Sequence, residues 1–154
     1  MTGNTTTIRS LTEEQLDDRV GLLQQRLSDR GHRITPQRLH ILRALLTASH
    51  PTAEDVWEQV RQVSPTTSLG TIYKTLDTLM EMGELIELDA RDDRRHYDAL
   101  NPYAHPHVVC SQCGRIEDVD MTGVPDLQAQ AAAASGYQIE DQRITFYGLC
   151  RQCR

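Results

Sequence analysis

The sequence predicts an α+β protein in which a winged helix-turn-helix is followed by a small α/β module. Apolar residues recur at helical spacing in four consecutive segments, and two short strand-like segments with a tight turn come next. Helices followed by a hairpin are the order of a winged helix-turn-helix. After about residue 100 the residue pattern changes to segments of β character around one alanine-rich stretch. We therefore expect two domains, residues 1–100 and residues 101–154, with residues 1–10 disordered.

The four predicted helices have recognisable boundary signals. The first spans residues 12–28, and Thr35, Thr52 and Ser68 stand where the N-caps of the next three would be, while Gly83 ends the last. The inward-facing residues are Leu16, Val20, Leu23 and Leu27, then Leu39, Leu42 and Leu45 or Leu46, then Val56, Val60 and Val63, and finally Leu69, Ile72, Leu76 and Leu79.

Short strands follow the helices. The hairpin is predicted at residues 84–89 and 95–100. In the second module an alanine-rich helix is predicted over residues 124–135, closed by Gly136. Three segments with β character surround it, and these are residues 108–109, 115–120 and 137–147.

Composition and charge exclude several classes of protein. The net charge of −6 argues against indiscriminate binding to nucleic acid, although a local surface can still bind DNA. No run approaches the roughly 18 apolar residues of a membrane span, and the Thr-rich N-terminus lacks the apolar region of a signal peptide, so we expect a cytoplasmic protein. No catalytic triad, phosphate loop or acid–base pair is visible, so neither an enzyme nor a small organic substrate is expected.

The four cysteines form two C-x-x-C pairs, Cys110 with Cys113 and Cys150 with Cys153. Two such pairs are typical of a structural zinc site with four thiolates. The alternative is a redox dithiol, but paired cysteines in a cytoplasmic chain favour a metal. Zinc would tie the two ends of the second module together, and its binding would then contribute to folding.

His105 and His107 stand just before the first cysteine pair, on either side of Pro106. Proline favours an extended residue before it, and side chains two apart on an extended segment point the same way. Two imidazoles with carboxylates suit Fe(II) or Mn(II). The alternative is a pair of surface histidines in a loop.

Five stretches together resemble the ferric uptake regulator family in order and spacing. They are residues 33–38 (RITPQR), 50–53 (HPTA), 71–76 (TIYKTL), 105–113 (HxHxxCxxC) and 146–153 (FYGLCxxC). The match extends from about residue 12 to the end of the sequence. The resemblance implies a metal-dependent transcriptional regulator that forms a homodimer through its second domain and binds double-stranded operator DNA through its first.

The resemblance also implies a regulatory site for Fe(II) or Mn(II). Its ligands would be His50, Asp98, His105, His107 and Asp118. Asp118 stands where iron-sensing members usually have glutamate, and Asp98 where zinc sensors usually have cysteine, which together indicate the peroxide-sensing branch. Asp98 precedes His105 by one residue more than expected, so His96 is an alternative ligand.

We expect no metal-binding role for two other histidines and no additional metal site of the kind found in some family members. His32 and His40 are interpreted as ordinary surface or helix residues. Some family members have an additional site in the dimerisation domain. Its usual histidine and acidic positions are occupied here by Ala104, Pro106 and Gln142, so we expect no such site.

The fourth helix carries the predicted DNA contacts. Taken alone, its polar face would be an ordinary solvated surface. In a helix-turn-helix, Lys74 could reach a guanine or a phosphate, and Tyr73 could contact a thymine methyl group. The arginines in the turn of the predicted hairpin, which is the wing of this fold, could bind phosphates. By resemblance, Tyr73 and Lys74 are the first candidates for base contact. The full set of predicted DNA-binding residues is Ser68, Thr71, Tyr73, Lys74 and Arg94.

The resulting hypothesis is a homodimeric repressor with Fe(II) or Mn(II) as corepressor. Fe(II) would react with peroxide, and the resemblance points to His50 and His105 as the residues that gain an oxygen atom, lose their metal affinity and release the DNA. The alternative is an iron or manganese uptake regulator that responds to metal level alone. Two alternatives come from other classes of protein. The helix-turn-helix pattern argues against a zinc-ribbon interaction module, and the absence of any sequence sign of a substrate pocket argues against a metalloenzyme.

Overall fold

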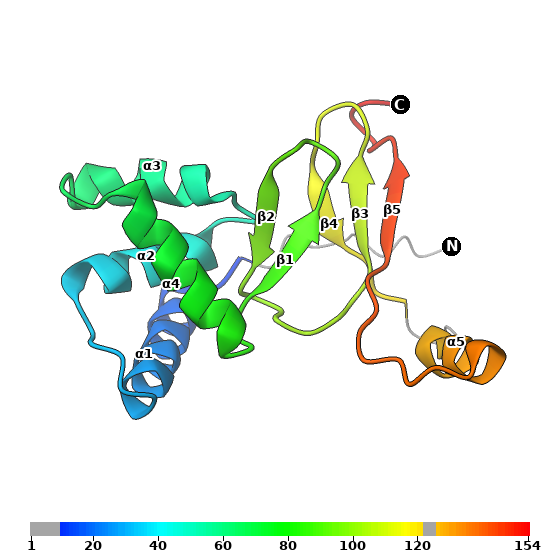
Figure 1. Ribbon diagram of the computed structural model, residues 1–154. Coiled ribbons are helices and arrows are strands. Elements are labelled where there is room, and N and C mark those ends of the chain that lie inside the picture. Colours follow the sequence, from blue (N-terminus) through cyan, green and yellow to red (C-terminus); the bar gives the residue numbers. More distant parts are fainter. Residues whose placement is uncertain (1–9, 122–125) are drawn as a thin grey trace. The chain divides into compact units, whose positions relative to one another are not determined.

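The computed structural model describes residues 10–121 and 126–154, which form two compact units (Figure 1). One unit ends at Pro102 and the other runs from Tyr103 to Arg154. The first contains helices and a hairpin and the second a small sheet with one helix, so the predicted α+β class is confirmed. The disorder expected over residues 1–9 and the expected helix start at residues 124–125 lie outside the described residues.

The first unit is built on four capped helices. They are α1 (Glu13–Asp29), α2 (Pro36–Thr47), α3 (Ala53–Val63) and α4 (Leu69–Glu81). Each begins with a hydroxyl side chain, from Thr12, Thr35, Thr52 and Ser68, that accepts a backbone N–H three residues later. These short-range bonds explain why the predicted helix starts lie within one residue of the observed ones.

The four helices share one hydrophobic core. Leu42, Val56, Ile72 and Leu76 are all fully buried, as helical periodicity predicts, and Ile41, which the prediction left out, is fully buried as well. The prediction for Val63 is wrong, because its side chain is 63% exposed. Val63 is the last residue of α3, where the helix has already left the core.

The hairpin is shorter than predicted at its open end, where β1 begins two residues later and β2 ends two residues earlier, while the predicted turn end is confirmed. Strands β1 (Ile86–Asp89) and β2 (Arg95–Asp98) pair antiparallel, with Ile86 opposite Asp98. The strand ends at Asp98 because this carboxylate accepts the backbone N–H groups of Leu100 and Asn101, each at 2.9 Å, which turns the chain. The Tyr97 N–H donates to the Pro51 carbonyl at 3.0 Å, so β2 is tied to the loop before α3.

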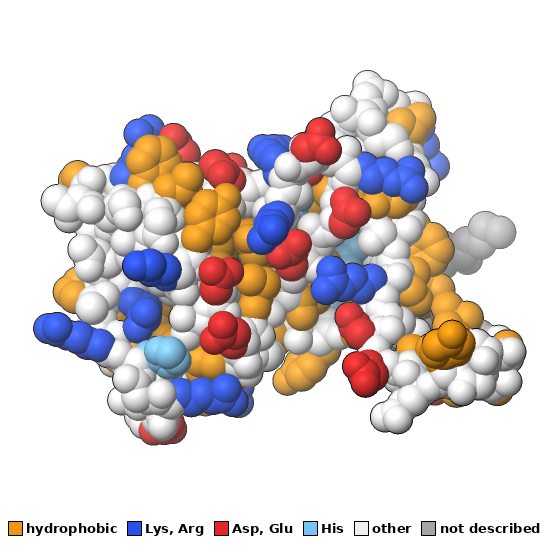
Figure 2. Space-filling model, viewed as in Figure 1, with side chains coloured by type: hydrophobic (Ala, Val, Ile, Leu, Met, Phe, Trp, Pro, Cys, Tyr) orange, Lys and Arg blue, Asp and Glu red, His pale blue; other side chains and the backbone are white. Residues whose placement is uncertain are grey.

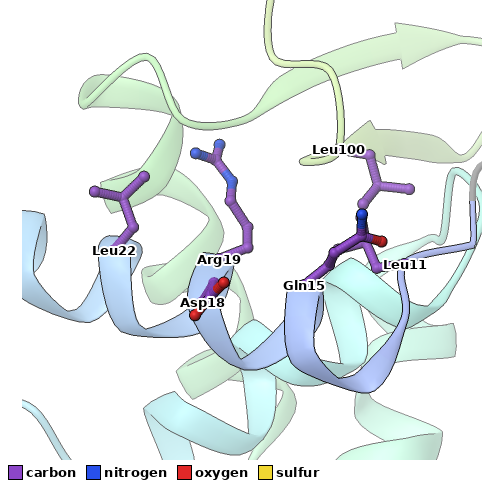
Figure 3. Close-up of a pocket in the computed structure, with 6 residues that line it drawn as sticks. All are labelled: Leu11, Gln15, Asp18, Arg19, Leu22 and Leu100. Atoms are coloured by element: carbon purple, nitrogen blue, oxygen red, sulfur yellow. The ribbon is translucent and has the colours of Figure 1, made fainter.

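Glu84, predicted to begin a strand, instead anchors α1. Its buried carboxylate accepts hydrogen bonds from Arg19, at 3.3 Å, and from Arg26. Arg19 also lines a shallow hollow beside α1 (Figure 3). The hollow is lined by Leu11, Gln15, Asp18, Arg19, Leu22 and Leu100, so it belongs to the packing of α1 against the segment after β2.

The second unit contains a three-stranded sheet of order β4-β3-β5. Its strands are β3 (His107–Cys110), β4 (Ile116–Asp118) and β5 (Thr145–Gly148). β3 pairs antiparallel with β4 and parallel with β5, which places His107 opposite Asp118 and Cys110 opposite Gly148. The predicted strand over residues 137–147 is wrong in its first eight residues, because β5 pairs with the sheet only along the four residues of β3.

Helix α5 (Leu127–Ser135) is capped by Asp126 and ends at Gly136, whose φ of 73° is a left-handed conformation that suits glycine. Figure 1 shows it set off from the sheet of its own unit, and none of its residues is buried. Among the described residues, no helix combines the length and the apolar character needed to cross a membrane.

We predict that Glu84→Ala destabilises the helical unit by about 1–3 kcal/mol, because two arginine hydrogen bonds to a buried carboxylate are lost. The free energy of unfolding from urea titration measures this. Glu81→Ala, which removes an exposed carboxylate of α4, is the matched control. Equal effects of the two substitutions would show that the Glu84 bonds contribute nothing.

Candidate metal centres and nucleic-acid interface

The structure brings the four predicted zinc ligands together within the second unit. The sulfur atoms of Cys110, Cys113, Cys150 and Cys153 all lie within 4.8 Å of one another. The Cys113 and Cys150 sulfurs are 3.8 Å apart, the edge length of about 3.8 Å expected for a tetrahedral site with zinc–sulfur bonds of about 2.3 Å. The parallel pairing of β3 and β5 produces this approach, because it sets Cys110 beside the turn that carries Cys150.

The electrostatics of this cluster favour a bound cation. Backbone N–H groups of Cys113, Cys150 and Gln112 point at the Cys110 sulfur and lower its pKa to about 6. The neighbouring sulfur of Cys150, burial and the other two thiols raise the pKa of Cys153 to about 12. One thiolate therefore opposes the ionisation of the next, and a divalent ion removes that conflict. The donor set fits structural Zn(II), as predicted.

A second group of potential ligands lies on β3, β4 and the segment before them. The Nε2 atoms of His105 and His107 are 3.1 and 3.5 Å from the same oxygen of Asp118. The strand register places His107 directly opposite Asp118. The Nδ1 atom of His105 lies 2.6 Å from the Tyr103 carbonyl, to which it donates, and this bond orients the ring so that Nε2 faces Asp118.

A third group lies in the first unit. His50 precedes α3 and Asp98 ends β2, and the His50 Nε2 atom is 3.6 Å from the Asp98 Oδ2 atom. The other polar atoms of both residues are held locally. Nδ1 of His50 meets the Ser49 hydroxyl at 3.1 Å, and Oδ1 of Asp98 accepts the two amides that end the strand. Each side chain thus turns one donor atom toward the other, which is how metal ligands are commonly oriented.

His96 is engaged away from this group. Its Nδ1 atom lies 3.0 Å from the His50 carbonyl and its Nε2 atom 2.8 Å from the Asp92 carboxylate. Both ring nitrogens of His96 therefore face oxygen acceptors other than the Asp98 carboxylate.

The predicted DNA-contacting residues of α4 lie at its start and on its outer face. Ser68 caps the helix, and its hydroxyl meets the Thr71 hydroxyl at 3.0 Å. Lys74 is exposed. The Tyr73 hydroxyl donates to Glu54 of α3 at 3.0 Å, and partial burial together with this bond raises the pKa of Tyr73.

Arg94 lies at the wing turn, where its guanidinium donates to Asp92 through Nε at 3.1 Å and Nη2 at 3.0 Å. Sequence reasoning missed the partners Glu54 and Asp92. Glu54 is 19 positions from Tyr73, and no periodic signal joins them. Asp92 and Arg94 are two positions apart, but spacing alone does not show that their side chains form a hydrogen bond.

Comparison with known proteins gives a consistent result. Residues 29–147 match the ferric uptake regulator family. A peroxide-responsive repressor, PerR, of Staphylococcus aureus is 32% identical over 143 residues, covering 92% of this chain and 93% of that protein. The Campylobacter jejuni peroxide stress regulator superposes with a TM-score of 0.65 at 28% identity, covering 87% of this chain and 98% of that one. A zinc uptake regulator solved with zinc and DNA has a TM-score of 0.69 at 25% identity, covering 92% and 95%.

We predict that Cys113→Ser abolishes tight zinc binding and unfolds the C-terminal unit, because three thiolates cannot close the tetrahedral site. Metal content after dialysis and far-UV circular dichroism measure the two effects. Ser111→Ala, an exposed change between the first two cysteines, is the control and retains one zinc per chain. A folded, metal-free Cys113→Ser protein would contradict the prediction.

Proposed function

The chain belongs to the ferric uptake regulator family, whose members are metal-responsive transcriptional regulators and not enzymes, and we propose that it is a peroxide-sensing repressor. In this proposal a homodimer binds double-stranded operator DNA with Fe(II) or Mn(II) as corepressor. The observation that best supports this proposal is the presence of two ligand groups. Each is composed of imidazole and carboxylate side chains, and each is oriented by contacts inside its own unit.

We propose that both groups bind the same ion. His50 and Asp98 would supply ligands from the DNA-binding domain, and His105, His107 and Asp118 from the dimerisation domain. A set of nitrogen and oxygen donors without thiolate suits Fe(II) or Mn(II). Because its ligands come from two domains, the ion would fix how they are oriented, and with it the spacing of the two recognition helices in the dimer. Residues 1–100 and 101–154 are the proposed domains.

The DNA contacts are proposed on α4 and the wing. Ser68, Thr71, Tyr73 and Lys74 would face the major groove, and Arg94 would hold a phosphate. The exposure of Lys74 and Arg94 supports these roles. The related zinc uptake regulator solved with DNA supports the partner.

Peroxide sensing is supported by the relatives and by the carboxylate-rich ligand set. Fe(II), when bound, can reduce peroxide and so oxidise the side chains that hold it. His50 and His105 are the proposed targets. A histidine that gains one oxygen atom loses the basic lone pair at its ligating nitrogen and would no longer bind the ion. The orientation of the two domains would then no longer be fixed, and the protein would release the DNA. The cysteines take no part while zinc holds them.

We predict that His107→Ala abolishes metal-dependent operator binding while zinc content stays unchanged, because the zinc ligands are four other side chains. Fluorescence anisotropy of a duplex, enriched from a random-sequence pool by the Mn(II)-loaded protein, measures binding across a manganese titration. His32→Ala is the matched control, since His32 belongs to neither ligand group. Metal-dependent binding that survives in His107→Ala would exclude this residue as a ligand.

We predict that Tyr73→Ala weakens binding to that enriched duplex by about 1–3 kcal/mol and affects random duplexes far less, because base contacts carry sequence discrimination. Competition titrations with the two duplexes give the difference. An equal loss on both duplexes would show that Tyr73 reads no base.

The last prediction separates peroxide sensing from metal sensing. Sub-stoichiometric peroxide should release the Fe(II)-loaded protein from DNA and leave the Mn(II)-loaded protein bound, because Mn(II) is much harder to oxidise by this route. Mass spectrometry of tryptic peptides should find one added oxygen atom on His50 or His105 with Fe(II) only. Unmodified histidines with oxidised cysteines would contradict the proposal and favour a regulator of metal uptake.

A further inference from the structure

His96 joins two distant parts of the first unit through its ring. On one side Nδ1 lies 3.0 Å from the carbonyl oxygen of His50, in the loop between α2 and α3. On the other side Nε2 lies 2.8 Å from the Oδ2 atom of Asp92, in the turn between β1 and β2. A single side chain therefore fixes the wing turn to the loop that carries a proposed metal ligand.

Asp92 continues this connection to Arg94. The Oδ2 atom that meets His96 also accepts Arg94 Nε at 3.1 Å and Nη2 at 3.0 Å, while Oδ1 accepts the Arg94 backbone N–H at 3.2 Å. Burial raises the pKa of Asp92, but the hydrogen bonds from His96 and Arg94 outweigh it and leave the pKa below its usual value. The Arg94 side chain is still 57% exposed, so it can contact a ligand from this fixed position.

The backbone at both ends of the connection is unusual. His50 has a φ of 49°, and Arg91 and Asp93 in the wing turn have φ values of 59° and 58°. Residues with side chains seldom adopt such positive values, and they do so where surrounding contacts hold the chain. The bonds of His96 and Asp92 are contacts of this kind.

We propose that His96 is a positioning residue which, through Asp92, holds the Arg94 guanidinium in the orientation that contacts a DNA phosphate. This rests on the proposed DNA-binding function. A guanidinium already fixed in place loses less conformational freedom on binding than a mobile one. This arrangement predicts an effect on DNA affinity opposite to the one expected from charge alone. Removing the Asp92 carboxylate deletes a negative charge near DNA, yet it should weaken binding because Arg94 is no longer oriented.

The test is a double-mutant cycle on the Mn(II)-loaded full chain, with anisotropy measured on the enriched duplex over a series of salt concentrations. His96→Ala should weaken binding by about 3–10-fold and reduce the salt dependence by about one phosphate contact. In an Arg94→Ala background, His96→Ala should cause no further loss. Asp92→Ala should behave like His96→Ala.

Arg95→Ala is the matched control. Arg95 precedes His96 on β2 and lies 3.8 Å from Glu87, so the His96 effect should persist in full in this background. Equal losses from His96→Ala with and without Arg94 would overturn the proposal. Tighter binding by Asp92→Ala would overturn it as well, since Asp92 would then be only a repulsive charge.

A readout without DNA separates this proposal from the proposed function. The Arg94 Nε–H resonance of the free protein should be shifted and protected from solvent exchange in the wild type, and lose both properties in His96→Ala and Asp92→Ala. An unchanged resonance overturns the positioning role whether or not the protein binds DNA. Failure of the wild type to bind any duplex with Mn(II) would instead overturn the proposed function. If His96→Ala fails to fold, Asp92→Ala in the exposed turn gives the same reading.

Discussion

Four sulfur atoms within 4.8 Å of one another are the constraint on which the C-terminal unit depends. Helix α5 buries none of its residues, and the buried apolar side chains of the described part of this unit are Val109, Cys110 and Ile116. So small a core within one chain contributes little against the entropy of closing the long segment between β3 and β5. The sulfurs bring those strands together only if their charges are neutralised. A bound divalent cation therefore stabilises the sheet, and the sheet in turn fixes the register that sets His107 opposite Asp118.

Three of the five proposed histidine and carboxylate ligands are oriented by a different means. In His105, His50 and Asp98 one polar atom is fixed by a nearby part of the chain and another faces a neighbouring side chain of the same ligand group. His105 uses the Tyr103 carbonyl, His50 the Ser49 hydroxyl, and Asp98 two backbone amides. These bonds form inside each unit, so the ligand directions do not depend on a metal. In the proposed function the ion then has only to bring two prepared groups together, and most of its binding free energy can order the domains.

The sequence-based predictions succeeded where short-range chemistry decides the structure. Helix starts followed from hydroxyl caps, and most of the buried positions of α1–α4 from their period, Val63 at the end of α3 being an exception. Strand ends could not be predicted in this way, because Asp98 ends β2 through its own side chain and β5 is only as long as the neighbour it pairs with. The ligand set came from family resemblance, since spacing alone leaves His50 and Asp98 undecided. The bond between His96 and the His50 carbonyl joins positions 46 apart and has no local signal.

The charge of the surface bears on how such a protein could be switched. The net charge is −6, and cations near the proposed DNA face have acidic neighbours, as Arg94 has Asp92 and Arg95 has Glu87. Figure 2 shows basic and acidic side chains interspersed over the unit of α1–α4. A strongly basic surface would hold DNA whether or not a metal were bound. A balanced surface attracts DNA weakly at long range, so in the proposed function affinity would come from many short contacts made at once by the two copies of the chain in the dimer. That requirement makes binding sensitive to domain orientation, which is the quantity that a metal with ligands from both domains would control.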